Sequence, residues 1–399
     1  MPDQNRTLPD WIDAWMLLTE NSEPPVLFRK WAGISTIASA LQRKVRVELG
    51  ISLKFYPNFY IVLVGPSATG KGTAMKYASD IISQVPQIRL AAQATSLQSL
   101  IRRMKETNLT DVNFETGDQQ FHSSLTIFSN EFTVFLGYHN NEMIAALCDW
   151  FDCHERWTYD TIKRDKEEIV GVWVNILAGT TPESLQASLP MSSIGTGLTS
   201  RIIFVYEEKH SKLVILPSED LKLQQCLVQD LEQISMLSGV MSYTKDALEV
   251  YSDWCFDSLK NPPFYDKRFD GYCGRRRNHL WSLAMVCNAS RGGDMIISSG
   301  DVQRSINLLN EVEVKMSLTF KGIGRSDIAD LINDAIVFVE NMEMPDVPMW
   351  QFARHFEGNM DRFTMERTLY TLEVSNYIKI IRKPGMDTII HRLIDGKKN

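Results

Sequence analysis

The sequence lacks several features that would assign it to a specialised class of protein. Its six cysteines are spread along the chain and none forms a CxxC pair, so neither a disulfide framework nor a zinc site is predicted. We expect buried free thiols in a reducing compartment. No apolar run approaches the roughly 20 residues that span a bilayer, and the N-terminus has no basic stretch followed by an apolar core. We therefore expect a cytoplasmic protein without a membrane partner.

Positive charge is also scarce. The chain has 42 Lys and Arg residues against 49 Asp and Glu residues, which gives a net charge of -7. Because this charge repels phosphate, any contact with nucleic acid must come from local basic patches. The remaining composition, 44% hydrophobic and 23% charged over 399 residues, is that of a globular protein with room for two or three domains.

The order of apolar segments predicts an α/β fold. Apolar runs at 59–64, 125–128, 171–179 and 201–206 indicate buried strands, and helical spacing precedes them over 8–44. Such alternation predicts a three-layer sheet. We expect four parts: N-terminal helices over 1–50, a core over 51–217, a helical lid over 218–325, and a small module over 326–399. In that module, three helices and two extended pieces around Pro384-Gly385 predict a winged helix.

The segment GPSATGKGT follows a predicted strand and opens a helix. Gly65 and Gly70 permit backbone angles that point successive amide groups at a phosphate, and the helix N-terminus adds a favourable field. Lys71 would reach the β and γ oxygens of a nucleoside triphosphate, which we expect to be ATP. The candidate nucleotide-binding residues of this segment are Gly65, Pro66, Ser67, Ala68, Thr69, Gly70, Lys71, Gly72, Thr73 and Ala74.

A magnesium ion and a catalytic carboxylate should lie beside this loop. Gly72 stands where a hydroxyl residue usually follows the lysine, so Thr73 is the candidate ligand for Mg²⁺. Glu131 follows the apolar run at 125–128, where a carboxylate can orient and deprotonate the attacking water. Asn130 stands where an aspartate would normally hold the metal. The alternative is that Glu131 caps a solvated loop.

Two other strands carry candidate residues at their ends. Asn175 lies within the run at 171–179 and Thr180 and Thr181 at its tip, so one of them could bind the γ-phosphate or the lytic water. Thr181, before Pro182, could instead cap a helix. Arg201, before the last strand, either pairs locally or projects into a neighbouring subunit's nucleotide, and we favour the second interpretation.

Two basic groups remain. Residues 155–171 indicate a β-hairpin whose charged tip, with Lys163, Arg164 and Lys166, could contact the phosphates of a DNA strand or could be ordinary surface. Arg275, Arg276 and Arg277 begin a helix of the predicted lid. One of these arginines could reach the ATP, and we favour Arg277.

The order of these motifs over about residues 8–320 resembles that of AAA+ ring ATPases, particularly the replicative helicases of phages, plasmids and mobile elements. The hairpin before the strand at 171–179 resembles the branch that includes the minichromosome-maintenance and superfamily 3 helicases. The resemblance implies a P-loop NTPase core that assembles as a ring, expected to be a hexamer. It also implies these roles: Walker A loop for Gly65, Gly70, Lys71 and Thr73, Walker B glutamate for Glu131, sensor 1 for Asn175, Thr180 or Thr181, arginine finger for Arg201, second sensor for Arg277, and pore hairpin for 163–166.

Three functions are compatible with these motifs. We expect an ATP-driven helicase that moves on single-stranded DNA during replication of a phage or mobile element, alongside other replication proteins. An ATP-switched initiator or helicase loader is the second possibility, because Gly72 and Asn130 alter the metal site and a switch tolerates slow hydrolysis. A nucleoside monophosphate kinase is the third, because GKGT also ends the phosphate loop of adenylate kinases, although such kinases are more compact.

Overall fold

The computed structural model describes residues 6–91, 95–112, 119–137, 140–161, 164–188, 197–216, 220–320, 327–342, 344–358, 360–382 and 387–393. The chain divides into two compact units, Met1–Lys321 (unit 1) and Gly322–Asn399 (unit 2). Among the described residues, the structure holds no helix that combines the length and the apolar character needed to cross a membrane.

A five-stranded sheet forms the centre of unit 1. Its strand order is β4 (Asn108–Val112), β5 (Gln119–Ser129), β8 (Val172–Thr180), β3 (Tyr60–Val64) and β9 (Ile202–Tyr206). The last four strands are parallel and β4 is an antiparallel edge. Strands β3, β8 and β9 are buried throughout, as expected where helices cover both faces. The predicted α/β class with a parallel sheet is therefore confirmed.

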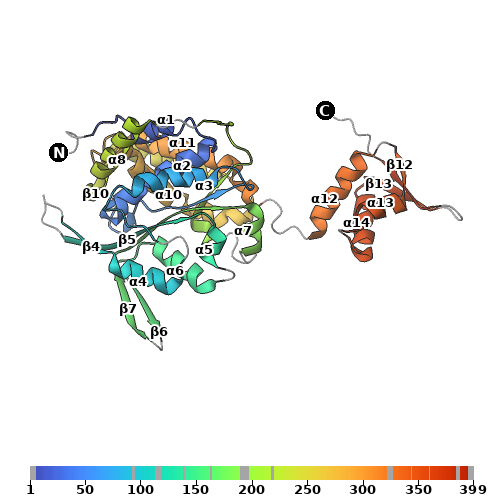
Figure 1. Ribbon diagram of the computed structural model, residues 1–399, viewed down its shortest axis with the longest axis horizontal. Coiled ribbons are helices and arrows are strands. Elements are labelled where there is room, and N and C mark those ends of the chain that lie inside the picture. The colour runs from blue at the N-terminus through green and yellow to red at the C-terminus, as the bar shows by residue number, and fades with distance from the viewer. Residues whose placement is uncertain are drawn as a thin grey trace. The chain divides into compact units, whose positions relative to one another are not determined.

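Helices cover the two faces of this sheet (Figure 1). On one face lie α2 (Val26–Leu41) and α3 (Lys71–Ile82), with α1 (Trp11–Leu18) farther out. On the other face lie α4 (Leu97–Glu106), α5 (Phe132–Leu136) and α6 (Asn141–Phe151). The strands β6 (Arg156–Thr161) and β7 (Arg164–Val170) form an antiparallel pair of their own, as the sequence predicts, and this pair projects from the body of the unit.

A second sheet of unit 1 has no counterpart in the sequence prediction. It joins β11 (Ile296–Ile297), β10 (Gly239–Tyr243), β1 (Val45–Leu49) and β2 (Leu53–Phe55) in that order. The region expected to be purely helical over 218–320 therefore contributes two strands. Its helices are α8 (Leu221–Ile234), α9 (Lys245–Lys260), α10 (Asp270–Arg291) and α11 (Ser299–Met316).

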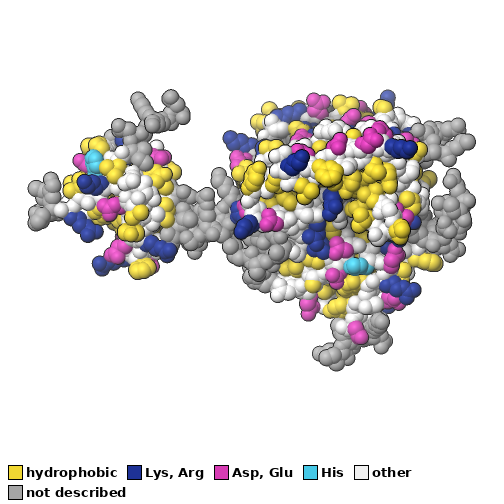
Figure 2. Space-filling view, turned by 180° about the vertical axis from the view of Figure 1, so that it is seen from behind, with side chains coloured by type: hydrophobic (Ala, Val, Ile, Leu, Met, Phe, Trp, Pro, Cys, Tyr) yellow, Lys and Arg dark blue, Asp and Glu magenta, His cyan; other side chains and the backbone are white. Residues whose placement is uncertain are grey.

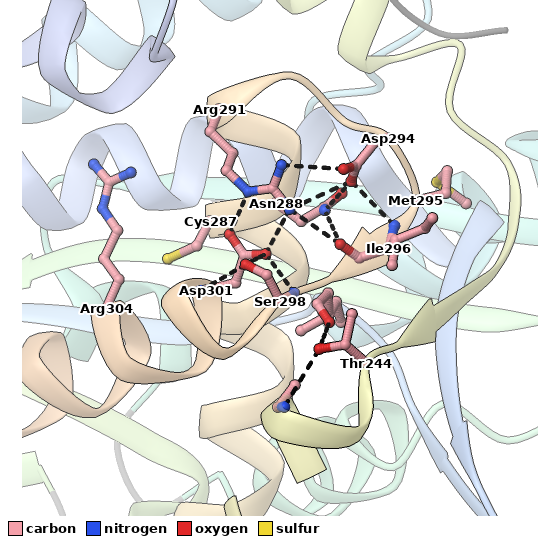
Figure 3. A network of polar contacts seen from close by, with 12 residues as sticks. Thr244, Cys287, Asn288, Arg291, Asp294, Met295, Ile296, Ser298, Asp301 and Arg304 are labelled. Atoms are coloured by element: carbon pink, nitrogen blue, oxygen red, sulfur yellow. Dashed lines mark hydrogen bonds and ion pairs between the residues drawn. The ribbon is translucent and has the colours of Figure 1, made fainter. Parts of the chain in front are cut away.

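A polar network fixes the connection between α10 and α11 (Figure 3). The guanidinium of Arg291 donates from Nε and Nη2 to the two carboxylate oxygens of Asp301, each at 2.8 Å. Asp301 also accepts from the backbone amide and the hydroxyl of Ser298, which closes a capping box at the start of α11. Because a capped and ion-paired helix start is held in place, the direction of α11 relative to α10 is set.

In its described residues, unit 2 contains three helices and a small antiparallel sheet. The helices are α12 (Asp327–Glu340), α13 (Met349–His355) and α14 (Arg362–Val374), and the strands β12 (Asp346–Pro348), β13 (Ile378–Ile381) and β14 (Ile389–Arg392) pair in the order β12, β14, β13. The second of the three predicted helices begins at Met349, because the residues before it form β12. The unit has its own apolar core, which includes Ala335, Phe352, Leu372, Ile378 and Ile390.

Candidate functional site

The candidate site lies at the edge of the central sheet where β3, β8 and β5 end. The register pairs Val64 with Thr180 and Ser129 with Ala178, so the loops that follow these strands leave the sheet at the same edge. This is the edge at which parallel α/β sheets commonly bind ligands. The structure therefore brings together the predicted loop over 65–73, Asn130, Glu131 and Thr180.

The 65–73 loop needs glycine at two positions. A Cβ atom at Gly65 would lie 2.3 Å from the backbone oxygen of Glu207, so any side chain there would displace the chain after β9. Gly70 has a φ of 85°, in the left-handed region that favours glycine, and a Cβ atom there would lie 3.0 Å from Cα of Pro24. The loop is thus confined between β9 and the residues before α2.

Lys71 lies within this loop and faces two carboxylates. Its Nζ donates to the backbone oxygens of Gly65 at 2.6 Å and Pro66 at 2.8 Å. Burial lowers the pKa of this ammonium, and the charges of Glu131 and Glu183 act in the opposite direction. The side chain of Glu131 makes no capping bond to α5 within the described chain. Glu131 therefore acts electrostatically on Lys71, and its side chain does not cap α5.

The predicted Mg²⁺ ligands lie on facing elements. The Oδ1 atom of Asn130 would be 3.9 Å from a Cβ atom at Gly72, and Thr73 is exposed on the same first turn of α3. Among the described residues, no group of three or more His, Cys, Asp or Glu side chains could hold a metal by itself. A Mg²⁺ ion bound with a nucleotide takes only one or two protein ligands besides phosphate and water. The hydroxyl, amide and carboxylate oxygens present here fit that requirement.

Two predicted ligands are corrected by the structure. Asn175 is fully buried: its Oδ1 accepts from the amide of Phe59 at 3.0 Å, and its Nδ2 donates to the hydroxyls of Ser35 and Ser39. Since the adjacent Ile176 pairs with Tyr60, Asn175 lies about 16 Å along the strand from the loop and holds α2 on the sheet instead. Ala74 is also unsuitable, because its amide already donates to the oxygen of Gly70 at 3.0 Å.

The two threonines after β8 have different surroundings. Thr180 is buried beside the loop, and its backbone oxygen accepts from the amide of Gly65 at 3.3 Å. The hydroxyl of Thr181 accepts from the amide of Ser184 at 3.2 Å, which is the N-cap bond of α7 (Pro182–Ser188). The capping alternative for Thr181 is thus observed, and Thr180 is the closer of the two to the loop.

Arg201 shows the local pairing that was its alternative interpretation. Its Nη2 lies 2.6 Å from Oδ2 of Asp152, and only 10% of its side chain is exposed. It precedes β9, so it lies at the opposite edge of the sheet from the 65–73 loop, because β9 is parallel to β3. In the structure, Arg201 does not project from the sheet as we favoured from the sequence.

The three arginines of α10 also lie away from the loop of their own chain. Arg275 donates to the hydroxyl of Ser200 at 2.9 Å, which places the start of α10 beside Arg201. Arg276 is buried in an ion pair with Glu313, and Arg277 is exposed. The start of α10, which carries Arg277, therefore lies beside Arg201, at the edge of the sheet opposite the 65–73 loop, and this does not favour the predicted role of Arg277 at the ATP.

The predicted DNA-binding residues belong to the chain segment that includes β6 and β7. Lys163 lies outside the described residues, and so do the side chains of Arg164 and Lys166. On the face of the molecule shown in Figure 2, acidic and basic side chains are interspersed and no large patch of one sign forms. On this face, any contact with the phosphates of a nucleic acid would therefore have to come from small groups of basic side chains. The negative net charge of the chain leads to the same expectation.

Several residues near the loop have no role in the sequence prediction. A pocket of about 470 Å³ adjoins the end of β9, and its lining includes Pro25, Val26, Tyr206, Glu207, Lys315 and Leu318. Lys315, in the last turn of α11, places Nζ 2.6 Å from Oε2 of Glu207. Glu183 and Glu207 could have been predicted from the sequence as residues of the site, since each follows a predicted strand closely. Lys315 had none, because its position depends on the packing of α11.

Comparison with known proteins gives no relative from which a function could be transferred. No protein-family model matches the chain, and no curated protein matches it. The function therefore has to be inferred from the geometry described above.

Proposed function

We propose that unit 1 is a P-loop ATPase core of the AAA+ type that binds ATP at the 65–73 loop and hydrolyses it. The observation that carries this proposal is the position of Lys71, which is held in the loop after the buried parallel strand β3. The charge of Glu131, which follows β5 on the other side of β8, acts on its ammonium group. A cation, a run of backbone amides and a carboxylate at one sheet edge are the parts that phosphoryl transfer to water requires.

Each residue has a distinct task in this proposal. Lys71 leaves the oxygens of Gly65 and Pro66 and binds the β and γ oxygens of ATP, while the amides of the loop and of the first turn of α3 hold the β-phosphate. Glu131 orients the attacking water and accepts its proton. Thr73 and Asn130 would hold Mg²⁺, which neutralises charge on the phosphates.

We extend this proposal to a ring-forming motor, expected to be hexameric, that moves on single-stranded DNA and unwinds duplex during replication of a phage or mobile element. Two features support the extension: the projecting β6–β7 pair, which suits a pore hairpin, and the three helices and antiparallel sheet of unit 2, which suit a winged helix. The step from ATPase to helicase rests on fold-level analogy.

An ATP-switched initiator or helicase loader is the second candidate. Asn130 replaces the expected metal-binding acid, and Arg201 is paired with Asp152 rather than presented to a neighbour. Both observations favour slow hydrolysis, which suits a switch better than a motor. The described residues give the kinase alternative no comparable support.

ATP hydrolysis and unwinding of a forked duplex, measured together with and without single-stranded DNA, separate the two candidates. For the motor, we expect DNA-stimulated hydrolysis with unwinding, and a loss of about 100-fold or more in hydrolysis for Glu131→Gln, because the water loses its base. Glu142→Gln, an exposed glutamate in the first turn of α6, is the matched control. Slow hydrolysis that DNA does not change, without unwinding, would favour the switch.

A further inference from the structure

The pocket at the end of β9 is lined by residues that lie in or next to the chain segments in contact with the 65–73 loop. Its wall residue Glu207 packs against Gly65 at the start of the loop, and Pro25 follows Pro24, which contacts Gly70 at the end. The amide of Glu207 also donates to the oxygen of Val64 at 3.0 Å. The pocket therefore lies next to the loop, close enough in the fold for a group attached to a bound phosphate to be considered as its occupant.

The pocket has the size and lining of a small-ligand site. Its volume of about 470 Å³ lies within the range of 300–1,000 Å³ that is usual for such sites. Pro25, Val26 and Leu318 give it apolar surface, and Tyr206 and Glu208, linked by a hydrogen bond of 3.3 Å, give it polar groups. A flat heteroaromatic ring with polar edges matches this lining better than a purely apolar ligand would.

Lys315 joins this pocket to the helical part of unit 1. It is half exposed, with 46% of its side chain accessible, whereas Glu207 is 14% exposed. An ion pair that is open to solvent on the lysine side contributes little stability. Replacement of the Glu207 carboxylate by another anion as the partner of Lys315 therefore costs little free energy. The flexible stem of lysine allows such an exchange, and triphosphate would carry more negative charge than Glu207.

We propose that this pocket holds the nucleoside of the bound nucleotide and that Lys315 exchanges Glu207 for the nucleotide's phosphates, so that α11 responds to nucleotide binding. The inference rests on the proposed ATP site and adds the residues that recognise the rest of the nucleotide. In this proposal Lys315, and not Arg277, is the basic residue of the predicted helical lid that contacts the nucleotide. It acts as a positioning residue, because Lys71 and Glu131 lie at the transferred phosphate.

Binding of ATP, ADP and inorganic tripolyphosphate to the full chain, measured by titration calorimetry, tests both parts. Val26→Trp fills the pocket, and we expect it to weaken ATP and ADP roughly tenfold or more while tripolyphosphate binds as before. Lys315→Met should weaken ATP and tripolyphosphate by about tenfold, and Lys315→Arg should retain most of the affinity. Lys30→Met removes a different, solvent-exposed ion pair of α11, Lys30 with Glu311 at 2.7 Å, and should change none of these affinities.

A thermal-unfolding cycle gives a second readout. Lys315→Met and Glu207→Gln should be coupled in their effects on Tm without nucleotide, and the coupling should vanish with saturating ATP. ATP binding that is lost in Lys71→Ala but unchanged in Val26→Trp and Lys315→Met would overturn this inference and leave the ATP site intact. A wild-type chain that binds no ATP would overturn the proposed function itself.

Discussion

His279 on α10 is a histidine that the fold holds in an apolar setting. It is fully buried, its ring stacks on Tyr272 at 5.5 Å and meets the edge of Phe151 at 5.9 Å. Neither ring nitrogen has a hydrogen-bond partner within the described part of the chain. Burial, together with the smaller effect of the nearby charges of Arg275 and Arg276, lowers the pKa of this imidazole to about 3.

This setting makes the stability of unit 1 depend on pH. Between pH 6.5 and about 3, the unfolded chain binds a proton at His279 and the folded chain does not, so the free energy of unfolding falls as the pH falls, by at most about 1.4 kcal/mol per pH unit. His279→Phe should reduce this dependence. Urea unfolding at pH 7, 6 and 5 measures it, with exposed His154→Ala as the control. Equal slopes for wild type and His279→Phe would contradict the prediction.

At the scale of elements, α10 and α11 are joined by a buried ion pair. Arg276 donates from Nε and Nη2 to the two oxygens of Glu313 at 2.7 and 2.9 Å, and the hydroxyl of Tyr272 donates to the same carboxylate. Burial raises the pKa of Glu313, against the effect of Arg276. The guanidinium of Arg276 also lies over the ring of Trp254 on α9. Side chains of α9, α10 and α11 are therefore all in contact at this ion pair.

Removal of one partner from this pair should be costly. Glu313→Ala leaves the guanidinium of Arg276 buried without its carboxylate, and we expect a loss of about 3–5 kcal/mol in the free energy of unfolding. The matched control is Arg277→Ala, one residue along the helix and exposed, which should stay within about 0.5 kcal/mol of wild type. Denaturant unfolding at pH 7 compares the two. A similar small effect for both variants would mean that the pair is not needed for stability.

Elements with local signals could be predicted from the sequence. The strand at 60–64, the glycine loop and α3 were found because an apolar run, two glycines and a helix start follow one another directly. The sheet of β11, β10, β1 and β2 was missed. Its pairing joins Val45 to Gly239 and Ser242 to Ile296, and no short sequence window contains both partners of such a pair.

The same distinction applies to the site. Lys71 could be predicted because it follows the glycine-rich loop, and Glu131 because it comes shortly after an apolar run. Asn175 was misassigned because a polar residue within a buried strand resembles a functional residue, whereas here it bonds to Phe59 and to α2. The partner of Arg201, Asp152, is 49 residues away in sequence, so its local pairing had no sequence signal.

At the scale of the whole molecule, the two units have separate cores. The core of unit 2 is made of residues between Leu331 and Ile390, while Phe320 at the end of unit 1 packs on Phe204 and Phe269. A chain that stops after Phe320 should therefore keep the Tm of unit 1 within a few degrees and bind ATP as the full chain does. Calorimetry and nucleotide titration test this. A chain that fails to unfold cooperatively would show that unit 1 depends on unit 2.

The contact between Pro24 and Gly70 links the loop to residues far from it in sequence. The backbone oxygen of Glu23 accepts from the amide of Ser211 at 3.0 Å, and the carboxylate of Glu23 accepts from the amide of Val214 at 3.3 Å. A displacement of the loop at Gly70 is thus passed to Pro24 by direct contact and from there to the segment that follows β9. The residues before α2 therefore couple the position of the loop to the position of the segment after β9. Spectroscopic labels at exposed Ser67 and near Val214 would report a movement of the loop as a change in the distance between the two labels.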